Sequence, residues 1–373
     1  MKIRESILPA AMLAMLAMTM LTVMLSWGQS VFADDTSPLD QRPQPWQRRD
    51  EPILSARTTK QGWCRVVCYS PHVIHHDGKF RMWYLGTSEA SRTNNMVMGY
   101  AESDDGIQWR EHPDNPVLTG DDVPWGTPIQ TPFVKHDAAT NRFRMWFVSG
   151  DGVSRDAKNK IIGNDQRLGH ATSADGIHWK VDPQALYPCG RSPSVTQISA
   201  NNYRMWMGSR PDHKLIDGGL YANIYEFRST DGLRWTRGPK PVLQPRAGAN
   251  SVVYPFVIRE GNAWYMWHGC HRDGGTFELF CAKSADGTNW DVDHTRLAFP
   301  AAEGKERFDS RYTSTPCIVP VGDRLLMYYS ARDWQRDYID AEGRKRRDGA
   351  SVYASIGVAE LKLKLKVSTT VND

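Results

Sequence analysis

Features that would point to several common classes of protein are missing from this sequence. Lys and Arg exceed Asp and Glu by only 46 − 42 = 4 among 373 residues, and basic residues form no long stripe outside one loop. No electrostatic field therefore favours nucleic acid as a partner. From Asp34 onward no apolar run is long enough to cross a bilayer, so we expect the mature chain to be soluble.

Sequence signatures of metal binding are missing as well. The six cysteines include no CxxC pair and no Cys/His cluster with zinc spacing, so no metal or other cofactor is predicted. Cys64 and Cys68 lie roughly 13 Å apart along a strand, which is too far for a disulfide bond. Cys270 and Cys281 flank an expected hairpin connection and could either bridge across it or remain buried thiols.

The composition is that of a folded protein rich in strands. Hydrophobic residues make up 40% of the chain and charged residues 24%, which excludes disorder as the main state. The sequence also contains 14 Trp, 14 Tyr and 11 Phe, and large aromatic rings suit both β-sheet faces and platforms for stacking sugars.

Residues 1–33 have the pattern of an export signal. Lys2 and Arg4 precede the apolar stretch Leu8–Trp27, and small residues at Val31–Ala33 predict cleavage before Asp34. The apolar stretch is long for a signal peptide and could instead remain as an uncleaved membrane anchor. Both alternatives place the rest of the chain outside the cytoplasm, as a periplasmic, secreted or anchored protein, with residues 34–45 as a linker.

One repeated unit organises residues 46–366. Each copy begins with a hydroxyl-bearing residue, a proline and a short apolar run, and the prolines recur every 61 or 62 residues. About ten residues after each proline comes a second apolar strand such as Met82–Tyr84. Turn residues separate the two strands, so each pair predicts a β-hairpin. The five prolines are Pro71, Pro132, Pro193, Pro255 and Pro316.

The second half of each unit predicts two further strands. A third strand such as Met98–Ala101 leads into a Ser-x-Asp-Gly-x-x-Trp turn, whose tryptophan begins a fourth strand. In such a turn Asp bonds the turn backbone, Gly supplies a positive φ and Trp packs between units, so we expect these aspartates to be structural. The turns begin at Ser103, Ser173, Ser229 and Ser284.

Five four-stranded antiparallel sheets around one axis form a five-bladed β-propeller, so the predicted fold class is all-β. The fifth unit ends at Ile356–Ala359 without its turn and fourth strand. Trp46–Leu54 has the pattern of the fourth strands that begin at Trp109 and Trp235. The N-terminal segment is therefore predicted to complete the last blade and close the ring, which leaves residues 367–373 as a tail.

The connections between strands differ between the two faces of such a propeller. The Asp-Gly turns are uniform in length, whereas the opposite connections vary in length and carry charge, including the basic run Arg344–Arg347. Function usually lies on variable loops over a rigid scaffold, so we expect the site on that second face, around the axis. These connections are residues 87–95, 151–167, 209–223, 270–278 and 332–351.

The motifs resemble those of a known group of enzymes. The Pro-led first strands, the Met-Trp-aromatic second strands and the Ser-x-Asp-Gly-x-x-Trp turns are similar to those of the five-bladed β-propeller glycosidases. This group holds arabinanases and β-xylosidases (family 43), invertases (family 32) and mannoside phosphorylases (family 130). The resemblance covers the whole mature chain, and Tyr328–Asp333 with Ile356–Ala359 is especially similar to the closing blade of the phosphorylase branch.

The resemblance implies an exported glycoside hydrolase that cleaves an oligo- or polysaccharide with two carboxylates in the axial pocket. Where the arabinanase branch carries its Asp and Glu, this chain has Ser70 and Arg191–Ser192. Two alternatives therefore remain open. One is a glycoside phosphorylase, and the other is a non-catalytic module that binds sugars or takes part in polysaccharide assembly.

Glycoside hydrolysis needs two carboxyl groups across the scissile bond. Glu226 is the first candidate, because it replaces Tyr100, His170 and Cys281 of the aligned third strands, where an unpaired carboxylate would be costly. A salt bridge to Arg228 or Arg204 is the competing interpretation. Asp151 and Asp333 are the other candidates, since both lie where a second strand leaves for the variable face.

Several further residues are candidates for substrate binding. Arg65, Arg191 and Arg311 each precede a first strand, and three guanidinium groups near the axis would suit an anionic sugar, although ion pairs within the fold are equally compatible. The remaining candidates are His72 and Asp309 beside first strands, and Trp125 and Trp334 near the variable loops as stacking platforms.

Overall fold

The computed structural model describes residues 37–89, 96–125, 129–150, 154–155, 161–163, 166–188, 190–209, 223–249, 251–272, 276–340, 342–347 and 353–363. The predicted export signal, the start of the linker, the C-terminal tail and the candidate Asp151 lie outside these ranges. Within the described ranges, no helix has the length and apolar character needed to cross a membrane.

The first three repeated units each contain four consecutive antiparallel strands, as their patterns predict. Those of the second and third units form separate sheets, whereas those of the first unit belong to a nine-stranded sheet that also includes the strands of the fifth unit. In each of the three units the second strand is almost wholly buried because both of its faces are apolar. The strands of the first unit are β3 (Val67–His76), β4 (Lys79–Thr87), β5 (Val97–Ser103) and β6 (Arg110–Glu111). Those of the next two are β7 (Ile129–Asp137), β8 (Arg142–Ser149), β11 (Arg167–Ser173), β12 (Lys180–Val181), β13 (Arg191–Ser199), β14 (Asn202–Ser209), β15 (Asn223–Ser229) and β16 (Thr236–Arg237).

The last two units differ in how their outer strands form. The fourth has β17 (Ser251–Glu260), β18 (Ala263–Arg272) and β19 (Thr276–Ser284), and Asp291 adds a single bridge to Lys283. The fifth has β20 (Tyr312–Val321), β21 (Arg324–Arg332) and β24 (Ala354–Lys362). The short strands β1 (Gln47–Arg48) and β2 (Leu54–Ser55) pair antiparallel with β24, so the N-terminal segment supplies the missing outer strand as predicted.

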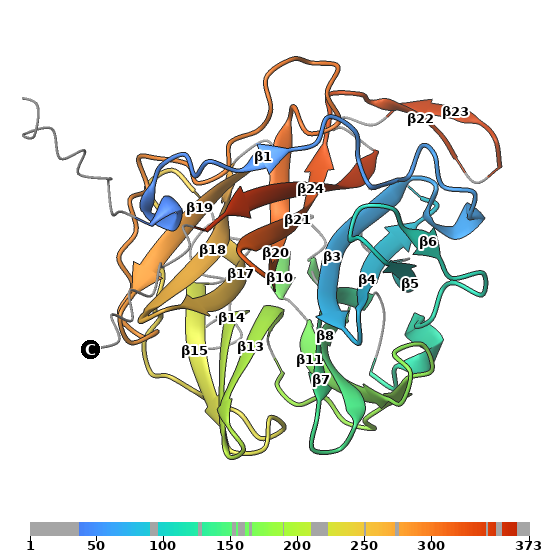
Figure 1. Cartoon of the computed structure of the whole chain (residues 1–373). Helices are drawn as coiled ribbons and strands as arrows, with labels where there is room; N and C mark the ends of the chain where they lie inside the picture. The colour runs from blue at the N-terminus through green and yellow to red at the C-terminus, as the bar shows by residue number, and fades with distance from the viewer. Residues whose placement is uncertain are drawn as a thin grey trace, which may run out of the picture. The chain divides into compact units, whose positions relative to one another are not determined.

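The first strands of the five units stand side by side around a common centre (Figure 1). β3 contacts β7, β7 contacts β13, β13 contacts β17, β17 contacts β20, and β20 returns to β3. The chain also places Ala354 of β24 beside Val67 of β3, in a parallel bridge. The first and last units therefore meet directly.

A hydrogen bond repeated between units holds neighbouring sheets together. The indole N–H of Trp83, which is fully buried on β4, donates to the carbonyl of Gly176 in the turn of the second unit, at 2.7 Å. Each such turn is built as predicted: Asp105 accepts from two backbone N–H groups, and Gly106 has a φ of 77°. The equivalent bonds are Trp146 to Gly232, Trp206 to Gly287, and Tyr328 Oη to Gly106.

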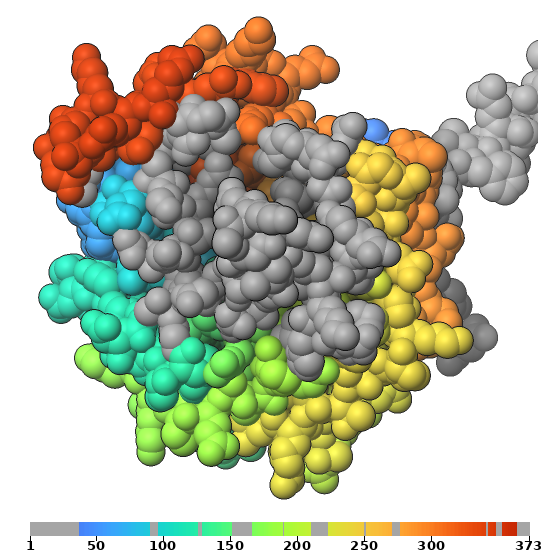
Figure 2. Space-filling model, turned by 180° about the vertical axis from the view of Figure 1, so that it is seen from behind, coloured from blue at the N-terminus to red at the C-terminus, as the bar shows by residue number. Residues whose placement is uncertain are grey.

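Short elements lie outside the repeated sheets. Two hairpins, β9 (Ser154–Arg155) with β10 (Ile161–Gly163) and β22 (Asp337–Ile339) with β23 (Lys345–Arg347), belong to variable connections. Three 3₁₀ turns are η1 (Pro38–Asp40), η2 (Gly62–Cys64) and η3 (Gly120–Asp122). In the space-filling view, the red atoms of the β22–β23 hairpin form one edge of the face opposite to that of Figure 1 (Figure 2).

Candidate functional site

The repeated prolines produce the same backbone irregularity in all five first strands. The residue before each proline has a φ between 39° and 56°, and the strand register shifts at that point. A positive φ is uncommon for a residue with a side chain, and a following proline restricts that residue further. The conformation is strained, and strained backbone of this kind gathers at functional sites. The residues are Ser70, Thr131, Ser192, Tyr254 and Thr315.

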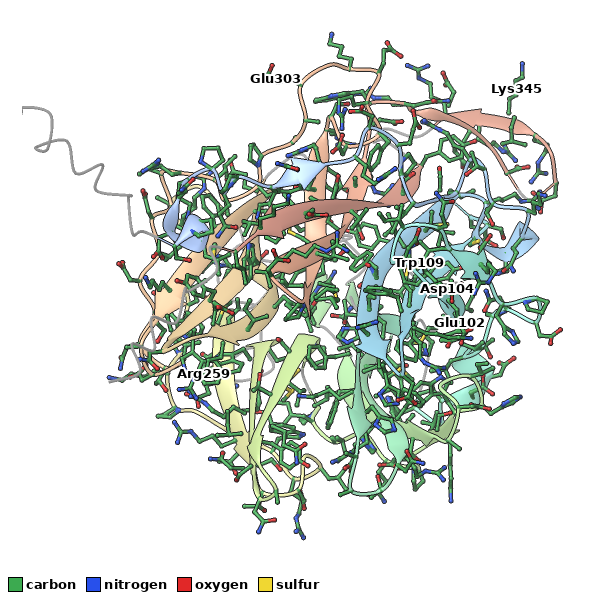
Figure 3. All side chains as sticks on the ribbon, in the orientation of Figure 1. Glu102, Asp104, Trp109, Arg259, Glu303 and Lys345 are labelled. Atoms are coloured by element: carbon green, nitrogen blue, oxygen red, sulfur yellow. The ribbon has the colours of Figure 1, made fainter. Side chains whose placement is uncertain are left out.

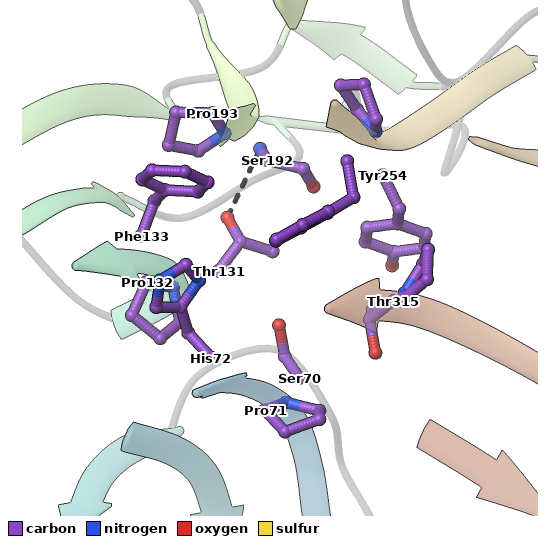
Figure 4. A pocket seen from close by; sticks show the side chains of 13 residues that line it. Ser70, Pro71, His72, Thr131, Pro132, Phe133, Ser192, Pro193, Tyr254 and Thr315 are labelled. Carbon is purple, nitrogen blue, oxygen red and sulfur yellow. Dashed lines mark hydrogen bonds between the residues drawn. The ribbon is translucent and has the colours of Figure 1, made fainter. Parts of the chain in front are cut away.

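Hydroxyl groups from neighbouring strands hold these irregular segments in place. The backbone N–H of Ser192 donates to Thr131 Oγ1 at 3.2 Å, across the gap between two units (Figure 4). The backbone N–H of Ser70 likewise donates to Ser330 Oγ at 2.7 Å, and Thr315 shares that hydroxyl. Thr131 and Ser330 therefore each help to position the first strand of a neighbouring unit.

A cavity of about 30 Å³ lies at the centre of the five irregular segments (Figure 4). That volume is the share of one water molecule in the liquid, so this part of the axis is too narrow for a sugar ring. The described residues that line it include no carboxylate. They are the residues before and at each of the five prolines, together with His72, Phe133 and Phe256.

His72 lines this cavity, as predicted, but its imidazole is occupied. Its Nε2 is bonded to the carbonyl of Val134 at 2.9 Å, and its ring lies 4.4 Å from that of Phe133 and 6.1 Å from that of Phe256. Burial lowers the pKa of His72 to about 4, so the ring is neutral near pH 7. His72 therefore packs the axis as a satisfied buried histidine.

A belt of polar side chains comes from the starts of the first strands. Gln166 donates to Gln130 Oε1 at 2.8 Å, and Arg191 donates to Gln166 Oε1 at 3.3 Å and to Tyr254 Oη at 3.0 Å. The guanidinium of Arg191 also lies 5.5 Å from the Tyr254 ring. The belt thus joins three neighbouring units through hydrogen bonds between side chains.

The same belt continues on the opposite side of the axis. Tyr69 and Ser314 share a hydrogen bond of 2.6 Å, and the buried guanidinium of Arg332 lies 5.7 Å from the Tyr69 ring. Burial, followed by the nearby Tyr254 and Tyr312, holds the pKa of Tyr69 well above its usual range. The phenol therefore stays neutral and is available as a hydrogen-bonding group.

The three arginines predicted to converge lie at separate points around the axis. Arg191 bonds to Tyr254, as described, whereas the guanidinium of Arg311 lies 5.8 Å from the Tyr312 ring and 5.7 Å from the Trp334 ring. Arg65 is half-buried just before β3. These contacts of Arg191 and Arg311 are thus with aromatic residues, and they do not bring the three guanidinium groups together.

Glu226 does not lie at the axis, and its carboxylate is fully engaged between two units. It faces Trp206 across the sheet and accepts hydrogen bonds from Arg204 at 2.8 Å, Arg228 at 2.9 Å and Thr288 at 2.8 Å. Both carboxylate oxygens are therefore occupied by contacts inside the fold and are not available to a substrate. The structure therefore assigns Glu226 to the salt-bridge alternative.

Asp309 is likewise structural in this arrangement, and not a residue of the axial opening. Its side chain is fully buried and accepts from Arg48 at 2.9 Å, Tyr329 at 3.0 Å and Arg307 at 3.1 Å. Because Arg48 belongs to β1, this carboxylate ties the N-terminal segment to the fifth unit. Its position just ahead of β20 had suggested a binding role, which the three internal donors exclude.

Asp333 lies on the variable face, as predicted, and is the described catalytic candidate that remains. It is buried at the end of β21 and forms a salt bridge with Arg57, whose guanidinium also bonds to Gln335 Oε1 at 2.7 Å. The same guanidinium lies 4.8 Å from the Tyr353 ring. Among the described residues, Arg57 is thus the charged partner of Asp333, and it is itself partly exposed.

A second and larger cavity lies near Asp333, although Asp333 does not line it. Two of its lining residues, Gln335 and Tyr353, contact Arg57, the salt-bridge partner of Asp333. The cavity has a volume of about 490 Å³, within the range of small-molecule sites, and it opens under the β22–β23 hairpin. Its lining combines two tyrosines with three cations and one carboxylate, and Lys345 projects from the hairpin (Figure 3). The lining residues are Gln335, Asp337, Tyr338, Ile339, Lys345, Arg346, Arg347 and Tyr353.

The two candidate tryptophans have different environments. Trp125 stacks on Phe147 at 6.2 Å, and a Cβ at Gly169 would come within 2.6 Å of its ring, so it is packed against a sheet. Trp334 is 51% exposed and lies beside Arg311. The role of a stacking platform therefore fits Trp334, whereas Trp125 serves packing.

Sequence reasoning missed the polar belt and the larger cavity. Gln166 and Tyr254 lie in different units, and Arg332 is not part of a repeated motif. The spacing of residues in the sequence therefore gave no sign that their side chains belong to one polar belt. The hairpin interrupts the repeat between β21 and β24, and its charge run was the one signal of it. All five described cysteines are free thiols, so Cys270 and Cys281 do not bridge.

No protein-family model matches this chain. Among curated proteins, the uncharacterized protein Rv1502 of Mycobacterium tuberculosis is 35% identical over 149 residues, covering 39% of this chain and 47% of that protein. Sucrose-6-phosphate hydrolase of Escherichia coli is 26% identical over 190 residues, covering 48% of this chain and 37% of the hydrolase. The matched stretch spans less than half of either relative.

Solved structures give a broader match. A structure from the family-130 mannoside phosphorylases and hydrolases aligns with a TM-score of 0.58 and 14% identity, over 84% of this chain and 93% of its own. The chain resembles the five-bladed β-propeller glycosidases in fold. A thermostable family-43 glycoside hydrolase aligns with a TM-score of 0.58 and 15% identity, over 80% of this chain and 92% of its own. An N-acetylgalactosamine deacetylase from F. plautii aligns with a TM-score of 0.59 and 15% identity, over 85% of this chain and 94% of its own.

Proposed function

We propose that the protein is an exported glycoside hydrolase that acts on an anionic oligo- or polysaccharide, on a five-bladed propeller closed by its N-terminal strands. The cavity near Asp333 is the observation that carries this proposal. Its volume of about 490 Å³ accommodates a sugar, whereas the axial cavity of about 30 Å³ does not. The fold shared with carbohydrate-active enzymes supports the same class of substrate.

The charge around the cavity supports an anionic substrate. Lys345, Arg346 and Arg347 line the cavity together with one acidic residue, Asp337. Arg57 contacts the lining residues Gln335 and Tyr353, and Arg311 lies against Trp334. Guanidinium groups recognise carboxylates and sulfates through paired hydrogen bonds. Trp334 and Tyr353 offer aromatic faces next to these cations. Sugars stack on such faces while their anionic groups bind the nearby cations.

The proposed chemistry uses Asp333 as one carboxylate and Asp151 as the second. Because Arg57 holds Asp333 in place through a salt bridge, we assign Asp333 the role of nucleophile or base. Asp151 follows β8 as Asp333 follows β21, so the repeat supplies both from equivalent ends of second strands. A glycoside phosphorylase would use the same cations to hold phosphate.

A second candidate function is carbohydrate binding without cleavage. It is favoured by the axial cavity, where the described lining residues include no carboxylate. Such a module needs only the aromatic and cationic groups of the larger cavity, and its fold would be identical.

The deciding experiment offers the purified protein a panel of anionic and neutral polysaccharides, with and without phosphate, and measures released reducing ends and sugar phosphates. The hydrolase proposal expects phosphate-independent cleavage that Asp333→Asn lowers by roughly 10²-fold or more. Asp323→Asn, at an exposed position in the turn between β20 and β21 and outside the cavity lining, is the matched control and should retain activity. Binding without products in any sample would replace this proposal with the binding module.

A further inference from the structure

A cluster of nitrogen and sulfur ligands lies in the fourth unit, apart from the proposed carbohydrate site. His268 and Cys270 are two residues apart on β18, so both side chains point to the same face of the sheet. His294 reaches this face from the loop that follows β19. One possible ligand atom of each residue lies within 4.8 Å of those of the other two.

The two histidines present nitrogen atoms that the fold leaves without partners. His268 is fully buried, and its Nε2 has no hydrogen-bond partner in the described part of the chain. The Nε2 of His294 is also buried and has no hydrogen-bond partner among the described residues. Buried polar atoms are normally bonded, so two such orphans facing one thiol require an explanation.

The surroundings of His268 favour a ligand at Nε2. Its Nδ1 lies 3.4 Å from the carbonyl of Met266, which suits a proton on Nδ1 and a free lone pair on Nε2. A backbone carbonyl on the other ring nitrogen is the usual support of a metal-binding histidine. The ring is further fixed by stacking on Phe280, with centroids 6.0 Å apart.

The loop that carries His294 is anchored on both sides. Before it, Asp291 and Lys283 exchange backbone hydrogen bonds of 2.8 Å. After it, the backbone N–H of Ala298 donates to Leu279 at 2.9 Å, and Asp293 accepts from Thr295 within the loop. His294 is therefore held near β18 by the fold and does not depend on a ligand for its approach.

We propose that His268, Cys270 and His294 form a binding site for a borderline-soft divalent metal ion, of which Zn²⁺ is the best fit. Two imidazoles and one thiolate are preferred zinc ligands, at about 2.0–2.1 Å for nitrogen and 2.3 Å for sulfur. Coordination draws the three atoms together by a fraction of the present spacing. The thiol proton of Cys270 leaves to solvent, and water takes the fourth position.

Sequence spacing could not reveal this site. The first two ligands are i and i+2 on a strand, and the third follows 24 residues later on a loop, which matches no common zinc motif. The prediction that the chain binds no metal rested on such motifs alone. The site would tie the fourth unit's outer loop to its central strand, at the place where only a single bridge pairs Asp291 with Lys283.

The test titrates tag-free protein, stripped with a chelator, with Zn²⁺ and with Co²⁺. We expect one tightly bound equivalent, a rise in Tm of about 5 °C at saturating Zn²⁺, and a thiolate-to-cobalt charge-transfer band. Cys270→Ser should abolish the band, and His294→Gln should weaken zinc affinity by roughly 100-fold. Cys270→Ser changes a buried strand residue and could disturb folding. His294→Gln changes a half-buried loop residue, so it tests the site even if Cys270→Ser does not fold.

Matched controls come from the same chain. Cys281→Ser removes another buried thiol, and His178→Gln removes a histidine whose side chain is 87% exposed, and both should bind zinc as the parent does. The proposal is overturned if the parent binds no equivalent at micromolar zinc. It is equally overturned if Cys270→Ser and His294→Gln bind zinc as tightly as these controls.

Discussion

The indole nitrogen of Trp267 donates a hydrogen bond to Oε1 of Gln44 at 2.8 Å. Tryptophans of the first three units make the equivalent bond to a glycine carbonyl in the following turn. The fifth unit lacks that turn, and the buried side chain of Gln44, which also accepts from Trp46 at 2.8 Å, takes the place of the missing carbonyl. A side chain from the N-terminal segment thus completes a contact that backbone makes elsewhere.

Substituting Gln44 should destabilise the whole ring. Gln44→Leu leaves two buried indole N–H groups without an acceptor, which costs about 1–3 kcal/mol each by the penalty for unsatisfied donors. Urea unfolding followed by tryptophan fluorescence and by circular dichroism should shift to lower urea as one cooperative transition. Gln41→Leu, at an exposed position nearby, is the control, and equal midpoints for the two variants would contradict the role of Gln44.

Removing residues 38–55 should have a larger effect of the same kind. The truncation deletes β1, β2 and Arg48, and so exposes the edge of β24 and leaves Asp309 with one charged partner fewer. We expect a markedly lower Tm and concentration-dependent aggregation, measured by calorimetry and light scattering. Melting like that of the parent would refute closure by the N-terminal segment.

Glu226→Gln should impair stability and leave chemistry intact. The neutral amide keeps hydrogen-bonding capacity toward Thr288 but loses its charge attraction to the buried Arg204, so we expect a loss of about 2 kcal/mol. Activity per folded molecule on any cleaved polysaccharide should equal that of the parent. Lost turnover in a variant of unchanged stability would restore Glu226 as a catalytic residue.

The lowered pKa of His72 should make the unfolding free energy of the protein depend on pH. Its pKa is about 4 in the folded protein and about 6.5 when unfolded, so between these values only the unfolded chain binds the proton. Stability contributed by the neutral ring is present above pH 6.5 and is lost as the pH falls toward 4, by about 3 kcal/mol. The difference in unfolding free energy between the parent and His72→Gln should become smaller as the pH falls from 6.5 to 4. A difference that stays constant over this range would contradict the assignment of His72 as a neutral buried ring.

The architecture was predictable from the sequence because it repeats. Prolines 61 or 62 residues apart fix five equivalent strands, and each Asp-Gly turn forms from its own few residues. The pairing of Trp46–Leu54 with the last unit followed from the same pattern. Local chemistry repeated in the chain therefore determines the strands, the turns and their order.

The site was less predictable because its contacts join distant segments. The exceptional position of Glu226 was visible in the alignment of repeats, but Thr288, 62 residues away, showed that its carboxylate is satisfied. Asp309 and Arg48 are 261 residues apart and meet only because the ring closes. The cavity near Asp333 depends on the β22–β23 hairpin, which lies in a connection of variable length, so the repeat could not inform the prediction.

Trp334 should contribute to carbohydrate affinity and little to stability, since half of its surface is exposed. Trp334→Ala is expected to weaken binding of a recognised sugar roughly tenfold through the lost stacking face. Ile198→Ala, at a residue of similar exposure on β13, is the control for loss of exposed apolar surface. Equal affinities in calorimetry would exclude Trp334 as a platform.

The central claim is that the face around Asp333 recognises an anionic carbohydrate, and calorimetric binding to matched pairs of polysaccharides tests it most directly. Each pair consists of an acidic polymer and its neutral form, such as a polyuronate and its methyl ester, or a sulfated glycan and its desulfated product. We predict that one acidic member binds, that its neutral form binds at least about tenfold more weakly, and that salt reduces the difference. Equal binding of both members of every pair, or binding of neutral forms alone, would contradict the account.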